Sequence, residues 1–333
     1  MNSPPTNVRF ARADGLDLPV IDLTHPAFDF DLGVDEVRAV IDRFLEDARK
    51  REKLPRFLER LVVGIFLRQS LLARGLRRGK GSFVAGLDTY LFKMGPDFVV
   101  GPPFAPVDRA IASSLPAVSM RLRLLDVSRL LAKGIAPALE ARRGPLALYN
   151  LGGGPAADSW NALLLTRRDR PELLWERPCS IRVVDLSDAA PTFGARAVEA
   201  LAEAGGPLDG VQVSFTYERY DWARPATLGP LLANADDDAV VAVSSEGALF
   251  EYATDDVVRA NLEAIHAHTP ADAVVAGSVT SDSELARLIG RDSRITLRPR
   301  SEEAFASLAR SAGWAVVESI DRPICRDVLL RKR

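Results

Sequence analysis

The spacing of apolar residues changes twice along the chain. Helical spacing first appears after residue 33, where apolar side chains recur at Val34, Val37, Val40, Ile41, Phe44 and Leu45. The same spacing predicts a second helix over about 55–72 and a third over about 118–142, broken or bent near Gly134 and Pro137. We therefore expect a helical N-terminal region, residues 1–117, followed by a second domain, residues 118–333.

After residue 144, apolar runs alternate with helical segments. The runs are LALYNL (146–151), IRVVDL (181–186), VQVSFTY (211–217), AVVAVSS (239–245) and DAVVAGSV (272–279). Continuous apolar strands separated by helices are typical of a parallel sheet covered on both faces. The last two runs, AVVESI (315–320) and CRDVLLRKR (325–333), are separated by so few residues that they must pair antiparallel. The predicted fold is α/β, with a doubly wound, mostly parallel seven-stranded sheet whose last strand is reversed.

Composition excludes several classes of protein. The chain is 47% hydrophobic and 26% charged with a formal net charge of -2, so no overall field favours nucleic acid or an anionic membrane. The two cysteines are far apart and the three histidines show no metal-ligand spacing, so we expect neither disulfides nor a metal. With no signal-peptide pattern and no apolar stretch long enough to cross a bilayer, we expect a soluble cytoplasmic protein.

The stretch LALYNLGGGPAAD runs from a strand pattern into three glycines, Gly152 to Gly154, which we call the glycine corner. It has no lysine, which excludes a phosphate-binding P-loop. Gly152, Gly154 and Ala157 fit the G-x-G-x-x-G/A spacing of a dinucleotide site, so an NAD(P)-dependent oxidoreductase stays open as an alternative. Against it, the acidic residue at the end of the next strand, Asp185, comes about thirty residues after Gly154 rather than about twenty.

The region from about 118 to 333 resembles the class I S-adenosylmethionine-dependent methyltransferases. In that family the first strand ends in acidic-x-G-x-G-P-G, and here it reads Asn150-Leu151-Gly152-Gly153-Gly154-Pro155-Ala156. The second strand ends in an acidic residue, here Asp185, and the third runs into an aspartate and a large apolar residue, here Asp221 and Trp222. The Ala-Gly-Trp turn at 312–314 is similar to the one before the family's reversed strand.

A narrower likeness is to the leucine carboxyl methyltransferase group. RLRLLD (121–126) is similar to its Arg-Thr-x-x-x-Asp, and SSEGALFEY (244–252) to its Glu-Gly-Leu-x-x-Tyr. Two residues depart from the class I pattern: Asn150 stands at the usual acidic position, and Ala156 stands in place of a glycine.

The resemblance implies S-adenosylmethionine as the cofactor and S-adenosylhomocysteine as the product. The residues it assigns to cofactor binding are Arg121, Asn150, Gly152, Gly153, Gly154, Asp185, Leu186, Asp221, Trp222, Ser244 and Ser245. Asp185 would accept the ribose hydroxyls, Asp221 and Trp222 would hold the adenine, and Arg121 would pair with the carboxylate. The alternatives are a helix cap for Asp185, a loop turn for Asp221 and a solvated helix face for Arg121.

Methyl transfer needs an aligned acceptor and, for some acceptors, removal of a proton. The candidates for that work are Glu246, Tyr252 and His25, with Glu246 first and an exposed loop position as the alternative for His25. We expect O-methylation of a small molecule; a catalytically inactive nucleotide-binding module is a further alternative. Residues 1–117 would cover the acceptor site, form a homodimer, or both.

Overall fold

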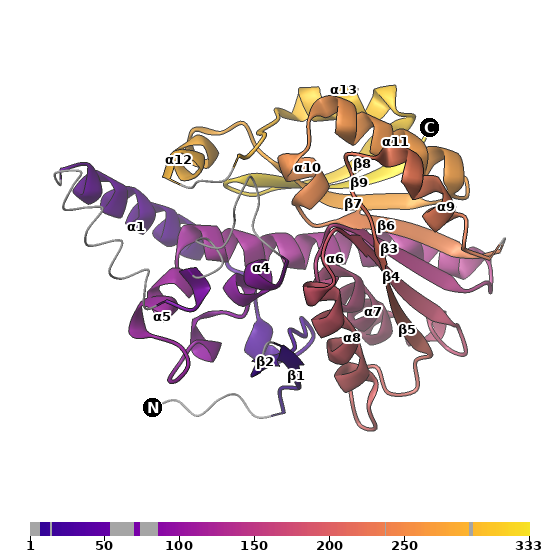
Figure 1. Ribbon diagram of the computed structural model, residues 1–333, viewed down its shortest axis with the longest axis horizontal. Coiled ribbons are helices and arrows are strands. Elements are labelled where there is room, and N and C mark those ends of the chain that lie inside the picture. Colours follow the sequence, from indigo (N-terminus) through magenta and orange to yellow (C-terminus); the bar gives the residue numbers. More distant parts are fainter. Residues whose placement is uncertain (1–6, 14, 54–69, 74–85, 237, 293–295) are drawn as a thin grey trace.

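The computed structural model describes residues 7–13, 15–53, 70–73, 86–236, 238–292 and 296–333. Most of the helix predicted over 55–72 lies outside these residues. A single mostly parallel sheet forms the centre of the molecule (Figure 1). Its strands are β3 (Leu146–Leu151), β4 (Cys179–Asp185), β5 (Val213–Arg219), β6 (Val240–Ser245), β7 (Val274–Thr280), β8 (Trp314–Asp321) and β9 (Cys325–Lys332).

The strand order across the sheet is β5-β4-β3-β6-β7-β9-β8. Neighbours from β5 to β7 run parallel, whereas β9 is antiparallel to both β7 and β8. Strands β3, β6 and β7 are buried at every position, as expected for strands covered on both faces. The predicted fold class, a doubly wound Rossmann-like sheet with a reversed last strand, is confirmed.

Helices cover both faces of this sheet (Figure 1). One face carries α6 (Leu115–Ala141), α7 (Ala157–Asp169) and α8 (Ala189–Ala202); the other carries α9 (Leu228–Leu232), α11 (Asp255–His268) and α13 (Glu302–Ser311). The shorter α10 (Ala248–Tyr252) follows β6, and α12 (Glu284–Asp292) follows β7. Short 3-10 turns are η1 (Pro26–Phe28), η2 (Pro96–Phe98), η3 (Pro171–Leu173) and η4 (Pro225–Thr227).

The prediction of a break near Gly134 and Pro137 is wrong, because α6 runs unbroken with Pro137 inside it. Gly134 lies where the helix packs tightly against the sheet: a Cβ there would lie 2.8 Å from Leu329 Cδ1 and 3.3 Å from Val274 Cγ2. Packing against β7 and β9 therefore explains the glycine, and the helix continues because tertiary contacts outweigh its low helix propensity.

The N-terminal region contains α1 (Val34–Glu52), α4 (Gly86–Lys93) and α5 (Pro106–Ala112). The expectation that its ordered elements are all helical is wrong, because β1 (Phe10–Ala13) and β2 (Leu16–Pro19) form an antiparallel hairpin. Strands of only four residues give too short an alternation to be recognised in the sequence.

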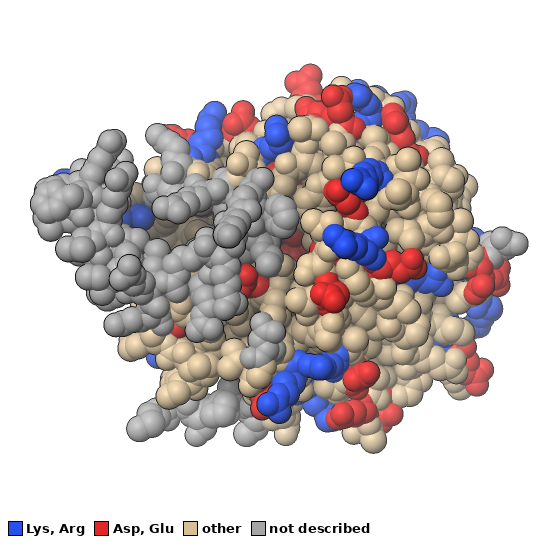
Figure 2. Space-filling view, in the orientation of Figure 1, with Lys and Arg blue, Asp and Glu red and all other residues tan. Residues whose placement is uncertain are grey.

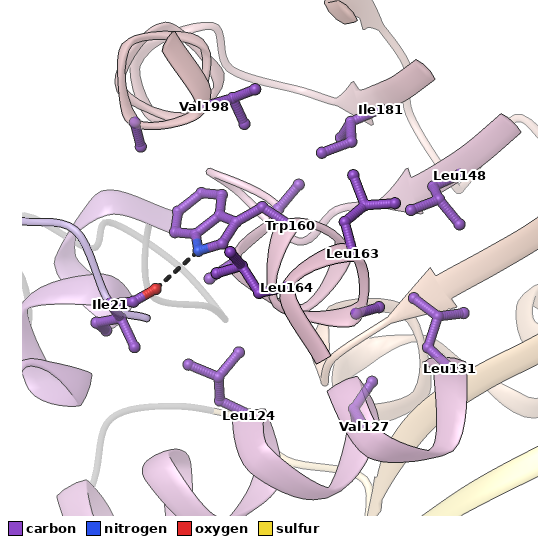
Figure 3. Packing of buried hydrophobic residues seen from close by; sticks show 14 of the residues in the cluster. Ile21, Leu124, Val127, Leu131, Leu148, Trp160, Leu163, Leu164, Ile181 and Val198 are labelled. Atoms are coloured by element: carbon purple, nitrogen blue, oxygen red, sulfur yellow. Dashed lines mark hydrogen bonds between the residues drawn. The ribbon is translucent and has the colours of Figure 1, made fainter. Parts of the chain in front are cut away.

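The N-terminal region shares a hydrophobic core with the sheet domain. Figure 3 shows Trp160 of α7 in this core, where its indole Nε1 donates to the Ile21 carbonyl oxygen at 2.8 Å. From α4, Tyr90 accepts a hydrogen bond from the Ile21 N–H at 2.9 Å, and its ring packs edge-on against Trp160 and Phe193. These contacts seat α4 on α7 and α8, beside the end of β3.

Candidate functional site

The glycine corner lies at the carboxyl end of β3, between β4 and β6, where the strand order reverses. This is the place where open α/β sheets bind their ligands. Gly152 and Gly154 both adopt left-handed backbone, with φ of 62° and 63°. Ala156 is also left-handed at φ 62° and leads directly into α7. Ala156 therefore holds a left-handed conformation that glycine adopts more readily.

Asn150 fastens the glycine corner to the neighbouring elements. Its side-chain Nδ2 donates to Asp158 Oδ1 at 2.7 Å and to Ser244 Oγ at 3.0 Å. Its Oδ1 faces Gly153 so closely that a Cβ at residue 153 would collide with it. Asn150 thus ties the corner to α7 and β6, and only glycine fits at 153.

Asp185 lies against the same corner from the end of β4. Its Oδ2 accepts from the Gly154 N–H at 3.1 Å and its Oδ1 from the Ser187 N–H at 3.2 Å. Burial raises the pKa of Asp185 above its usual value, and the hydrogen bonds from these N–H groups act in the opposite direction. No hydrogen bond from the described residues makes Asp185 the cap of α8, whose N-terminal cap residue is Asp188. The next residue, Leu186, is exposed.

Trp222 covers the corner from the loop after β5. A Cβ on Gly152 would lie 2.6 Å from Trp222 Cζ3, so the indole ring lies directly against this glycine. The preceding Asp221 is half-buried, and its Oδ1 accepts from the Ala223 N–H at 3.0 Å. The structure therefore brings Trp222 to the corner and shows Asp221 bracing its own loop.

Gly86, at the start of α4, is a contact of the corner that is not among the predicted site residues. A Cβ on Gly86 would lie 2.5 Å from Gly154 Cα, and one on Gly154 would lie 2.7 Å from Gly86 Cα. Two glycines thus allow backbone to meet backbone. The N-terminal region reaches the corner through this contact.

Arg121 is not directed at the corner. Its Nη1 donates to the carbonyl oxygens of Ala112 at 2.8 Å and Phe92 at 3.4 Å, and its guanidinium lies over the Phe30 ring. Burial lowers the pKa of Arg121 to about 10. In this structure Arg121 holds N-terminal segments to α6, which differs from both of its predicted roles.

Glu246, immediately after β6, belongs to a buried charge cluster of Lys93, Arg123, Glu246 and Glu251. Lys93 Nζ lies 2.6 Å from Glu246 Oε2, and Arg123 Nε lies 3.4 Å from Glu246 Oε1. Arg123 also contacts Glu251 at 3.3 Å. Desolvation acts to lower the pKa of Arg123, but the carboxylates of Glu251 and Glu246 raise it above its usual value. Both oxygens of Glu246 thus face cations, a better arrangement for positioning than for accepting a proton.

The other predicted catalytic residues lie at separate places. Tyr252 is the half-buried last residue of α10, five residues beyond Gly247, and its carbonyl oxygen accepts from Arg298 Nε at 3.1 Å. His25 caps η1, where its Nδ1 accepts from the Ala27 N–H at 3.1 Å. Neither of these hydrogen bonds joins His25 to Tyr252.

Ser244 and Ser245 are buried at the end of β6. Ser245 Oγ donates to the Leu151 carbonyl oxygen at 3.0 Å, while Ser244 receives the Asn150 amide described above. Both serines therefore fasten β6 to the end of β3, and they support the corner from within.

The charged side chains on the described part of the surface do not indicate a particular class of ligand. Figure 2 shows Lys and Arg side chains interspersed with Asp and Glu over the described part of the visible face. Among the described residues, no helix is long and apolar enough to cross a membrane, and no group of His, Cys, Asp and Glu could hold a metal ion.

Comparison with known proteins supports the fold. No protein-family model and no curated protein sequence matches the chain. Among solved structures, a possible exported protein from Bordetella parapertussis is similar with a TM-score of 0.57 and 18% identity, covering 89% of this chain and 96% of that protein. At this identity, the likeness concerns the fold alone.

Two methyltransferases are more distant. The mitomycin 7-O-methyltransferase MmcR has a TM-score of 0.41 and 15% identity, with 80% of this chain and 70% of MmcR covered. The O-methyltransferase NcsB1 from neocarzinostatin biosynthesis, solved with S-adenosyl-L-homocysteine and 1,4-dihydroxy-2-naphthoic acid, has a TM-score of 0.40 and 19% identity, with 67% and 58% covered.

Proposed function

We propose that this chain is an S-adenosylmethionine-dependent methyltransferase that acts on an oxygen atom of a small molecule. The observation that carries the proposal is the meeting of Asp185 with the glycine corner through the 3.1 Å bond from the Gly154 N–H. A carboxylate at a strand end, beside a left-handed glycine turn at the point where strand order reverses, suits a ligand with a ribose diol.

The residues around the corner fit the parts of this cofactor. Asp185 would accept the ribose hydroxyls, because a carboxylate oxygen can accept more than the one N–H bond it has here. Trp222 offers an aromatic face, with the exposed Leu186 at the end of β4. The glycines allow the Trp222 ring and the Gly86 backbone to lie directly against the turn. When bound, the cofactor supplies an electrophilic methyl group on a sulfonium; the chain's own residues bind and orient.

The charge cluster favours one kind of methyl acceptor. Glu246 is held by Lys93 and Arg123, so a substrate proton would have to compete with two cations for its oxygens. An acceptor that arrives already ionised, such as a carboxylate or an acidic phenol, needs no base. This arrangement supports an acidic oxygen acceptor, with Tyr252 and His25 as the remaining proton-handling candidates.

Calorimetry with S-adenosylmethionine, S-adenosylhomocysteine and NAD tests the proposal. We expect binding of the first two ligands; binding of NAD alone would show that the chain is a nicotinamide protein. Asp185→Ala should weaken S-adenosylhomocysteine binding by at least roughly tenfold through loss of charge-assisted bonds. Asp188→Ala, at an exposed carboxylate three residues further on, is the matched control and should leave affinity unchanged.

Methyl-labelled cofactor then tests turnover. We expect label to be incorporated into a component of a metabolite extract. The stability of the labelled product to hydrolysis would then distinguish a methyl ester from a methyl ether. Binding without transfer to any component would instead support the inactive binding module.

A further inference from the structure

Asp158, in the first turn of α7, is a fully buried carboxylate with one unsatisfied oxygen. Its Oδ1 accepts from Asn150 Nδ2 at 2.7 Å. Its Oδ2 is buried and has no hydrogen-bond partner, and no ion pair joins Asp158 to a cation of the described chain. A buried carboxylate is costly unless a cation or further donors compensate it. Among the described contacts, Oδ2 therefore keeps its capacity to accept a hydrogen bond from a further donor.

Asn150 cannot supply the missing charge at the corner. Its amide is neutral, its Nδ2 is used by Asp158 and Ser244, and its Oδ1 is pressed against Gly153. The carboxylate instead stands eight residues further along the chain, joined to Asn150 by the hydrogen bond. The negative charge thus lies beside the glycine corner, but on α7 rather than at the end of β3.

The surroundings of Asp158 leave this buried charge without an ion-pair partner among the described residues. Burial and nearby Glu246 together raise the pKa of Asp158 to about 6, against the opposing effects of a hydrogen bond from Ser244, the charge of Lys93 and a backbone hydrogen bond from Ser159. Lys93 is bound to Glu246 at 2.6 Å and is not in ion-pair contact with Asp158. A cation brought by a ligand would therefore meet a carboxylate that no ion pair of the described residues compensates.

We propose that Asp158 is the carboxylate that receives the ammonium group of the cofactor's methionine moiety, and that Asn150 positions it. This inference rests on the proposed function, which brings to the corner a ligand with an ammonium group. A merely structural Asp158 would instead stabilise the positive end of the α7 dipole.

Calorimetry with two ligands separates these roles. The probes are S-adenosylhomocysteine and its deaminated analogue, in which a hydrogen atom replaces the ammonium. Asp158→Asn should weaken binding of S-adenosylhomocysteine roughly tenfold to a hundredfold and leave binding of the analogue within about twofold. Asp188→Asn, which removes an exposed carboxylate, should change neither affinity. Equal losses for both ligands, or no loss, would overturn the assignment.

A charge exchange provides a second variant. Asn150→Asp combined with Asp158→Asn moves the carboxylate to the end of β3 and keeps the net charge and both side-chain sizes. Its affinity for S-adenosylhomocysteine should recover to within about threefold of the wild-type value. Failure to recover in a variant that melts cooperatively would show that the ammonium does not pair with a charge at this place.

The wild-type protein alone also tests the inference. The preference for S-adenosylhomocysteine over the deaminated analogue should increase between pH 5 and pH 8 as Asp158 ionises; Glu246 and Lys93, which face it, remain in both complexes. A preference that is constant with pH would overturn the role of Asp158 while leaving the proposed function intact. Wild-type protein that binds neither S-adenosylmethionine nor S-adenosylhomocysteine would overturn both.

Discussion

The glycine corner and the charge cluster lie at neighbouring strand ends but are built in opposite ways. The corner consists of small residues, positive φ angles and hydrogen bonds within a short length of chain, with Asp185 and Trp222 added from the next two loops. The cluster consists of buried charges, and its members Lys93, Arg123 and Glu246 come from three distant parts of the sequence. One region is shaped by the backbone and the other by electrostatics.

This difference predicts how each region fails. A corner held by close backbone approach is sensitive to a single added methyl group. A buried ionic cluster is sensitive to the loss of one partner, because the remaining charge stays buried. The following substitutions test this contrast.

The largest effect is expected in the charge cluster. Arg123→Met removes the cation that contacts both Glu246 and Glu251, and should lower the free energy of unfolding by about 3–5 kcal/mol. Arg129→Met, on the same helix, removes only an exposed pair with Asp31 and should cost less than about 1 kcal/mol. Denaturant unfolding measures both; similar losses would mean that burial adds nothing to the cluster.

The next effect concerns pH. The pKa of Asp158 is about 6 in the folded protein, above the ordinary value of 3.8. Between these pH values the folded protein holds a proton that the unfolded chain has lost, so stability falls as pH rises from about 4 to 6. Asp158→Asn should abolish this part of the decline. The free energy of unfolding of the variant, minus that of wild type, should therefore be about 2–3 kcal/mol higher at pH 8 than at pH 4. An unchanged pH profile would contradict it.

Gly153→Ala should then destabilise the corner by about 1–3 kcal/mol, because the new Cβ collides with Asn150 Oδ1. In an Asn150→Ala background the same substitution should cost much less. A double-mutant cycle of thermal melts measures the coupling. Additive losses would show that Asn150 is not what excludes a side chain at 153.

The smallest effect is expected where α4 meets the corner. Gly86→Ala places a methyl 2.5 Å from Gly154 Cα, and the net cost should be about 1 kcal/mol because Ala has a helix propensity about 1 kcal/mol better than Gly, which offsets part of the clash. Gly33→Ala, at the start of α1, is the control, since its Cβ would meet only Glu36 Oε2 at 3.5 Å. If the two variants are equally stable, α4 does not rest on the corner in solution.

Much of the sheet domain is predictable because its information is local. Strands β3, β6 and β7 are found within two residues of their observed bounds, since buried parallel strands are continuous apolar runs. Asp185 is predictable because the ends of neighbouring parallel strands meet at one edge of the sheet. The hairpin of β1 and β2 was missed because two four-residue strands leave almost no periodic pattern.

The amino-acid sequence by itself determined the antiparallel direction of the last strand, the glycine turn and the acidic residue that faces this turn. Only the tertiary structure decided that Lys93 and Arg123 enclose Glu246, that Arg121 holds the N-terminal region, and that Gly86 rests on the corner. It also placed a buried carboxylate with one unpartnered oxygen, Asp158, beside Asn150. The physical reason is the range of each interaction: periodicity and turn geometry act between neighbours in the chain, whereas burial and charge pairing depend on which distant residues share the same space.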